Sequence, residues 1–187
     1  MKFTFTPTEI PAVLLVEHER FADSRGSFAE SYREDAFAAA GLPRMVQDNH
    51  SRSMKSVVRG LHYQKAPRAM GKLVRCLRGA VLDVAVDIRR GSPSYGKWVG
   101  VELTEDNRRM LWVPPGFAHG FAALSDVADV FYKMDEYYSL EHDRGIRWND
   151  PDIGVAWPTP HPVLSAKDDN APLLAEIDND FVYRTAP

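Results

Sequence analysis

The chain has 187 residues, of which 44% are hydrophobic and 26% charged, a composition typical of a single globular domain over residues 1–187. This composition excludes a disordered or collagen-like chain. The single cysteine, Cys76, excludes a disulfide framework and a zinc site built on cysteines. No apolar run approaches the length of a membrane-spanning helix, and the short, proline-interrupted stretch at the N-terminus does not resemble a signal peptide. We therefore expect a cytoplasmic protein with no membrane partner.

The formal net charge is −3, which argues against general binding of nucleic acid. The charge is unevenly spread along the chain. Residues 44–90 hold 11 Lys or Arg against 3 Asp or Glu, whereas residues 135–187 hold 4 against 11. Most of these side chains are typical of solvated surface. A basic cluster inside an otherwise acidic protein also suits a small anionic ligand, such as a phosphate-bearing metabolite.

In chain order, the first predicted element is a helix over residues 33–40, which is rich in alanine and is stopped by Gly41 and Pro43. In the strand predicted over residues 81–88, every second side chain is a large aliphatic one. Alternation and turn residues predict the full set of strands at 72–77, 81–88, 97–103, 109–113, 117–124 and 127–134.

Short strands separated by turns every 8–12 residues are typical of an antiparallel sandwich or barrel. A small all-β jelly roll that encloses a ligand cavity fits this pattern best. The last 40 residues carry four prolines between Pro151 and Pro162 and are predicted to wrap irregularly, with a short helix near residues 172–177.

The six histidines show no HxH or HxxxH spacing and none lies beside the cysteine. The metal set that is usual in such barrels, two close histidines with a following glutamate, is absent, because residues 60–64 supply only His62. We therefore expect no bound metal. His119 lies between Gly116 and Gly120, and these glycines could let a backbone approach a ligand closely. Taken alone, each histidine is more typical of a structural residue.

Two basic residues, Arg59 and Lys72, flank His62 in the sequence. Arg59 and His62 differ in strand parity, so they share a face only if the chain bends or if Gly60 forms a bulge. Unpaired buried charge is costly, so such a pair is a poor core arrangement. It suits a diphosphate or an enolate that develops negative charge.

Nucleophilic catalysis has little support. Cys76 lies in an alternating strand and is predicted to be packed, and there is no GxSxG, P-loop or GxGxxG motif. Tyr132 offers a phenol that could donate a proton or stack on a base. Asp168 could orient a histidine, although residues 165–168 by themselves indicate only a turn.

Together, nine short motifs resemble, in order and in register, those of the dTDP-4-dehydrorhamnose 3,5-epimerases, from about Ile10 to Leu174. They lie at residues 21–26, 47–51, 58–64, 71–74, 83–89, 115–121, 132–133, 148–151 and 165–168. The resemblance implies a cupin-type double-stranded β-helix with a few short helices. It also implies a homodimer that needs neither a metal nor an organic cofactor.

The resemblance implies an isomerase that inverts C3 and C5 of dTDP-4-dehydro-6-deoxy-D-glucose and gives dTDP-4-dehydro-L-rhamnose, for dTDP-L-rhamnose and cell-surface polysaccharide. His62 would be the base, paired with Asp168, which fixes the imidazole tautomer. Tyr132 would be the acid on the opposite face of the sugar. Lys72 would stabilise the enolate oxygen.

The remaining residues carried over from the family bind the substrate. Arg59 and His119 match contacts to the sugar diphosphate, and Lys167 matches a further ligand contact. The nucleotide contacts are matched by Arg25, Glu30, Gln47 and Asn49, with Tyr138 as the aromatic that stacks on the base. Arg25, Phe28 and Glu30 would reach into the site of the neighbouring subunit.

Two positions depart from the family pattern. Met70 stands where a glutamine is usual, two residues before the lysine, and Asp143 stands near a glutamate that contacts the nucleotide. The alternatives are an epimerase that acts on C3 or C5 alone, or one that acts on another nucleotide's sugar, such as CDP or GDP. Two further alternatives are a 3,4-ketoisomerase, against which the Tyr132 and Asp168 motifs argue, and a non-enzymatic sugar-nucleotide sensor.

Overall fold

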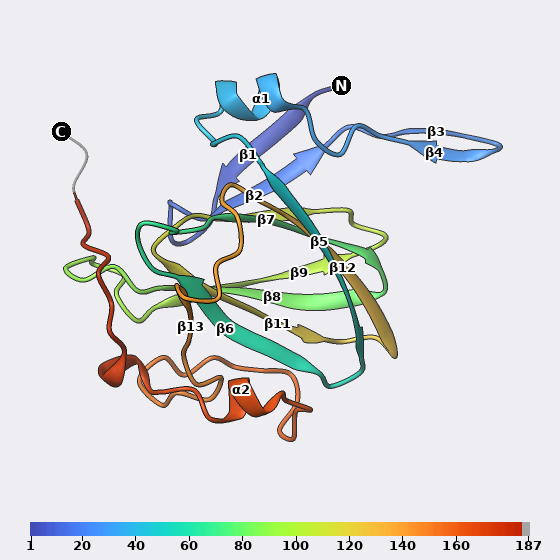
Figure 1. Ribbon diagram of the computed structural model, residues 1–187. Coiled ribbons are helices and arrows are strands. Elements are labelled where there is room, and N and C mark those ends of the chain that lie inside the picture. Colours follow the sequence, from blue (N-terminus) through green and yellow to red (C-terminus); the bar gives the residue numbers. More distant parts are fainter. Residues whose placement is uncertain (185–187) are drawn as a thin grey trace.

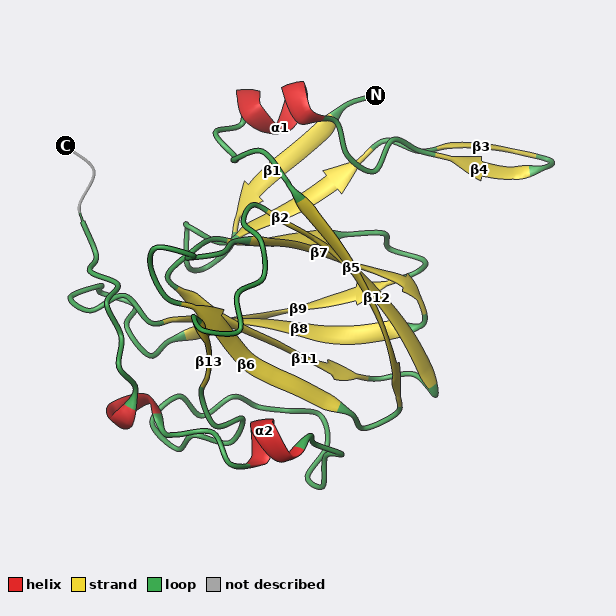
Figure 2. Ribbon diagram, in the orientation of Figure 1, coloured by secondary structure: helices red, strands yellow, loops and turns green. Residues whose placement is uncertain are grey.

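The computed structural model describes residues 1–184, and β-strands dominate it (Figures 1 and 2). The strands are β1 (Phe3–Pro7), β2 (Leu14–His18), β3 (Phe21–Asp23), β4 (Gly26–Phe28), β5 (Gln47–Met54), β6 (Val58–Gln64), β7 (Lys72–Arg78), β8 (Ala80–Asp87), β9 (Trp98–Thr104), β10 (Met110–Val113), β11 (Phe117–Ala123), β12 (Val127–Met134) and β13 (Asp143–Gly145). The helices are α1 (Glu34–Ala39), α2 (Ala166–Asp169) and the 3-10 helix η1 (Leu174–Glu176).

Two antiparallel sheets form the body of the molecule. The six-stranded sheet has the order β1-β2-β10-β7-β12-β5, and the five-stranded sheet has the order β13-β6-β11-β8-β9. The two sheets face each other in a jelly roll, and the hairpin β3–β4 projects away from them (Figure 1). This arrangement confirms the predicted all-β class.

The six strands predicted from alternation are all present as β7 to β12, and the predicted helix is α1. In β8 the alternation has two buried faces. Val81 and Ala85 pack in the core between the sheets, while Val84 and Val86 pack outward against the C-terminal part of the chain. Because both faces are covered, this strand is apolar on both sides except at its aspartates.

The strand β5 does not follow an apolar alternation and was not among the predicted strands. Its inward positions are Gln47, Asn49, Ser51 and Ser53, which lie opposite the inward residues of β12 in the antiparallel register. This polar face runs from a cavity, which Asn49 lines, to the core, where Ser53 lies opposite Ala128.

The C-terminal segment covers the outer face of the five-stranded sheet, where Ile146, Ile153 and Leu174 join the cluster on β8. The helix η1 confirms the short helix predicted near residues 172–177. Residues 165–168, which by themselves indicated only a turn, begin a further helix, α2, because the Ser165 side chain accepts a hydrogen bond from the backbone N–H of Asp168. Within residues 1–184, no helix is long and apolar enough to cross a membrane.

Candidate active site

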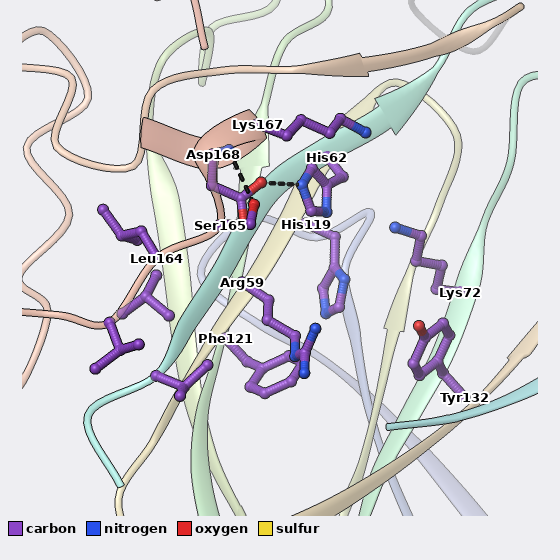
Figure 3. Close-up of a pocket in the computed structure, with 13 residues that line it drawn as sticks. Arg59, His62, Lys72, His119, Phe121, Tyr132, Leu164, Ser165, Lys167 and Asp168 are labelled. Atoms are coloured by element: carbon purple, nitrogen blue, oxygen red, sulfur yellow. Dashed lines mark hydrogen bonds and ion pairs between the residues drawn. The ribbon is translucent and has the colours of Figure 1, made fainter. Parts of the chain in front are cut away.

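A cavity of about 390 Å³ opens between the two sheets at the end of the barrel that the core does not fill. We call it the main cavity. It is lined by Val57, Val58, Arg59, His62, Lys72, His119, Phe121, Tyr132, Val163, Leu164, Ser165, Lys167 and Asp168 (Figure 3). A second hollow of about 220 Å³, the side cavity, shares His62, Lys72, Tyr132 and Lys167 with it and therefore adjoins it.

His62 and Asp168 form a hydrogen-bonded pair at the wall of the main cavity. His62 Nε2 lies 2.5 Å from Asp168 Oδ1, and the Asp168 side chain is only 5% exposed (Figure 3). Burial alone would raise the pKa of this carboxyl, but hydrogen bonds from His62 and Ser165 and the backbone of Gly60 hold it below the ordinary value. An ionised Asp168 can only accept, so a neutral His62 carries its proton on Nε2 and keeps a lone pair on Nδ1.

A bulge brings Arg59 and His62 to the same cavity. On β11, His119 and Phe121 are two residues apart, but their partners on β6 are His62 and Arg59, three residues apart. Of the two predicted alternatives, a bend or a bulge at Gly60, the extra residue confirms the bulge. A Cβ built at Gly60 would lie 2.6 Å from the Gly120 Cα, so β6 and β11 can come this close only because both positions are glycine. Gly120 thus serves this strand contact, while a Cβ at Gly116 would meet the side chain of Arg89.

Lys72 on β7 and Tyr132 on β12 reach the cavity from the opposite sheet, so they face His62 across it (Figure 3). Burial lowers the pKa of Lys72 to about 8, while the nearby carboxylates of Asp143 and Asp83 act in the other direction. A lysine with this pKa is still mainly charged at neutral pH. The cavity therefore holds a cation, a phenol and a base around one central space.

His119 has a carboxylate partner that the sequence did not reveal as part of the site. Its Nε2 lies 2.9 Å from Asp83 Oδ1, and both side chains are buried. Burial lowers the pKa of His119, against the opposing effect of Asp83. Asp83 occupies an inward position of β8 near Ala85, and the only signal for it in the sequence was a carboxylate inside an otherwise apolar strand.

Four further predicted residues, Asn49, Tyr138, Asp143 and Lys167, line the side cavity, and Gln47 contacts two of them. Tyr138 donates from its hydroxyl to Asp143 Oδ2 at 3.0 Å, and Lys167 pairs with the same carboxylate. Gln47 accepts from the backbone N–H of Tyr138 at 3.0 Å and donates to Asn49 Oδ1 at 3.1 Å. These contacts make one polar cluster beside the catalytic candidates.

Three other predicted residues lie away from the main and side cavities in the single chain. Arg25 and Phe28 are on the hairpin β3–β4, which projects from the barrel (Figure 1). Arg25 pairs with Asp23, and Phe28 is 67% exposed. Glu30 pairs with the N-terminal amine and with Arg33.

Met70, the first departure from the family pattern, lines the side cavity and is 6% exposed. Cys76 is packed in the core as predicted, and burial raises its thiol pKa to about 11. In residues 1–184 no group of three or more His, Cys, Asp or Glu side chains is arranged to hold a metal ion.

Comparison with known proteins identifies the family of this chain. The family model for dTDP-4-dehydrorhamnose 3,5-epimerase matches residues 7–176. A dTDP-4-dehydrorhamnose 3,5-epimerase from Shigella flexneri is 53% identical over 173 residues, which cover 91% of this chain and 96% of that protein. A dTDP-4-dehydrorhamnose 3-epimerase from Streptomyces niveus is 43% identical over 172 residues, 91% of this chain and 83% of that protein.

Among solved structures, the dTDP-6-deoxy-D-glucose-3,5-epimerase of Legionella pneumophila, crystallised with dTDP-4-keto-L-rhamnose, superposes with a TM-score of 0.94. It shares 44% sequence identity, and the match covers 98% of this chain and 100% of that one. The fold is accordingly the cupin-type jelly roll of these epimerases. The chain belongs to the dTDP-4-dehydrorhamnose 3,5-epimerase family, a family of isomerases.

Proposed function

We propose that this protein inverts C3 and C5 of dTDP-4-dehydro-6-deoxy-D-glucose and so forms dTDP-4-dehydro-L-rhamnose. The observation that carries the proposal is the pairing of His62 with Asp168 across the cavity from Lys72 and Tyr132. A base, a cation and a phenol around one space are the groups that proton transfer next to a ketone requires.

The first step is removal of a proton. C3 and C5 both neighbour the C4 ketone, so loss of either proton gives an enolate. His62 takes the proton on Nδ1, because Asp168 holds the Nε2–H. The resulting imidazolium lies beside an ionised carboxylate, which stabilises its positive charge.

The second requirement is stabilisation of the enolate. As the C–H bond breaks, negative charge develops on the C4 oxygen. The Lys72 ammonium faces the same cavity, and a positioned charge in a site partly shielded from water stabilises such an oxygen by several kcal/mol.

The third step returns a proton to the opposite face of the carbon. Tyr132 lies on the sheet opposite His62, so its hydroxyl can give its proton to the face that the base did not use. The configuration is then inverted. The phenolate regains a proton and the imidazolium loses one to solvent, which restores the site for the second carbon.

The side cavity suits the nucleotide. Tyr138 is 53% exposed and offers a ring on which a thymine can stack, and Lys167 supplies a positive charge next to it. Arg59 extends into the main cavity, and no carboxylate pairs with it among residues 1–184. It is therefore free to neutralise a diphosphate between the sugar and the nucleotide.

We propose further that residues 1–187 form one domain and that the working unit is a homodimer in the cytoplasm. The hairpin β3–β4 projects away from the barrel (Figure 1). Its two aromatic rings are exposed, Phe21 at 62% and Phe28 at 67%. If a second copy received this hairpin, it would cover those rings. Arg25 and Glu30 of the first copy would then reach the site of the second copy. The product would feed dTDP-L-rhamnose and cell-surface polysaccharide synthesis.

The decisive experiment incubates the purified protein with dTDP-4-dehydro-6-deoxy-D-glucose in deuterated water and follows C3 and C5 by NMR. Deuterium at both carbons is expected. Addition of the downstream NADPH-dependent reductase should then yield dTDP-L-rhamnose. Absence of label at both carbons with tight substrate binding would instead indicate a sensor, and a 3-keto product would indicate a ketoisomerase.

A single-carbon epimerase is the second candidate, because a relative that is 43% identical is a 3-epimerase. Label confined to C3 would establish that candidate and overturn the double inversion. The same experiment with CDP- and GDP-linked sugars tests the nucleotide.

The dimer has its own test, which mixes two inactive chains. If each site combines His62 of one chain with Arg25 of the other, co-refolded His62→Ala and Arg25→Ala chains regain about a quarter of wild-type activity, because one site in each mixed dimer is intact. No recovery, in a mixture shown to contain mixed dimers, would rule out the shared site.

A further inference from the structure

Asp83 is a buried carboxylate that the mechanism above does not use. It is 0% exposed, its Oδ1 lies 2.9 Å from His119 Nε2, and its Oδ2 is a buried oxygen with no hydrogen-bond partner among residues 1–184. We propose that Asp83 is a positioning residue that fixes His119 as the Nε2–H tautomer, so that His119 offers an unprotonated Nδ1 to a hydroxyl group of the bound sugar.

The argument begins with the number of protons on His119. Burial lowers the pKa of this ring, so the neutral form with one N–H is favoured. An ionised carboxylate accepts hydrogen bonds and cannot donate them. The single proton must therefore lie on Nε2, between the ring and Asp83. Nδ1 is then an acceptor, and a substrate hydroxyl is the donor that it fits.

The two histidines of the cavity are arranged alike. His62 and His119 are direct partners across β6 and β11, and each has its Nε2 turned to a buried carboxylate. In both rings the carboxylate decides which nitrogen meets the substrate. His62 uses that nitrogen to take a proton, whereas His119 uses it to hold the sugar in place.

Asp83 has a second electrostatic effect, on Lys72. The charged groups near Lys72 are Asp143 on β13 and Asp83 on β8, which favour the ammonium, and Lys167 on α2, which opposes it. His62 and Tyr132 line the same space. Removal of the Asp83 charge should therefore move the loss of the Lys72 proton to lower pH.

The test substitutes Asp83→Asn, which keeps the size of the side chain but adds a donor. The amide can turn either its oxygen or its NH₂ group toward His119, whereas the carboxylate can only accept, so the ring proton is no longer confined to Nε2. Asp87→Asn is the matched control, because Asp87 is an equally buried carboxylate on the same strand that binds Arg89, Ser92 and Ser94.

The primary measurement is the ¹H–¹⁵N spectrum of the imidazole rings in protein labelled at histidine, with the His119 signals assigned through His119→Gln. We expect an Nε2–H ring in the wild type and in Asp87→Asn, and both Nε2–H and Nδ1–H rings in Asp83→Asn. For activity we expect Asp83→Asn to lower kcat about 10- to 100-fold, the effect of one hydrogen bond to a charged group. The alkaline limb of its pH profile should also lie lower than in the wild type.

This inference rests on the proposed function only in its kinetic part, because the tautomer is read without substrate. An Nδ1–H ring in the wild type would overturn it even if Asp83→Asn did not fold. So would an unchanged ring in folded Asp83→Asn, or an equal loss of kcat in Asp87→Asn. If the ring behaves as expected but no variant or wild type exchanges sugar protons, the proposed function fails while the positioning of His119 stands.

Discussion

Asp168 Oδ1 lies 2.5 Å from His62 Nε2, although the two residues are 106 positions apart in the sequence. His62 belongs to β6 and Asp168 to the short helix α2 of the C-terminal segment. The base of the proposed reaction is therefore assembled from two distant parts of the chain.

His62→Ala should lower kcat by about 10²- to 10⁴-fold, which is the contribution of a well-placed general base. The ring is partly exposed to the cavity, at 29%, so its loss should leave the barrel folded. Steady-state turnover and the circular dichroism spectrum check this. His161→Ala, at an exposed position outside both cavities, is the control and should retain full activity. Wild-type turnover in His62→Ala would place the base elsewhere.

Tyr132→Phe should separate the two proton transfers. With the phenol gone, His62 can still remove a proton and return it to the same face, so we expect deuterium exchange to persist while inversion is lost. NMR in deuterated water measures both in one sample. Tyr137→Phe, which changes a 58% exposed phenol outside both cavities, is the matched control. Normal inversion by Tyr132→Phe would refute the role of this phenol as the acid.

The activity should fall as the pH rises through about 8, because burial lowers the pKa of Lys72 to about 8 and only its charged form stabilises the enolate. The sign follows from the lysine being protonated below its pKa and neutral above it. Arginine stays charged across this range, so Lys72→Arg should lack this limb even if its kcat is lower.

A fall in kcat at the same pH in Lys72→Arg would assign the limb to another group. Lys72→Met removes the charge altogether and should lower kcat by about 10²- to 10³-fold at pH 7, as the loss of one group that stabilises an oxyanion does. A change confined to KM would show that Lys72 binds the substrate without stabilising the transition state.

Gly60→Ala should destabilise the fold by about 3 kcal/mol, since it combines a backbone at positive φ with a contact that has no room. The added Cβ would lie 2.6 Å from the Gly120 Cα, at a φ of +126°. Gly41→Ala is the control, because Gly41 also has a positive φ, +81°, but its Cβ would meet nothing within 4 Å. Its cost should be about 1 kcal/mol. Urea unfolding measures both values, and equal costs would show that the contact between β6 and β11 is unimportant.

The sequence predicted those elements whose side chains pack in regular alternation. The strand over residues 81–88 is one example, since an aliphatic residue at every second position leaves few other structures. The bulge at Gly60 was predictable too, because Arg59 and His62 could share a cavity only if the strand parity changed there.

The walls of the site were harder to predict than the core. β5 escaped prediction because its inward residues are polar and give no apolar alternation; one of them, Asn49, lines the side cavity. Asp83 escaped prediction because a carboxylate within an apolar strand does not show what it binds. Its partner, His119, belongs to the neighbouring strand β11. Asp168 was found only through the family resemblance, since residues 165–168 alone indicate no more than a turn.

The place of Asp168 in the chain has a consequence for truncation. Every strand within residues 1–184 ends by Gly145, whereas Asp168 and the apolar residues that cover the outer face of β8, such as Ile153 and Leu174, follow later. A chain that stopped after β13 would lack both the carboxylate that orients His62 and the cover of the five-stranded sheet. The base and the packing of that sheet therefore depend on the same segment.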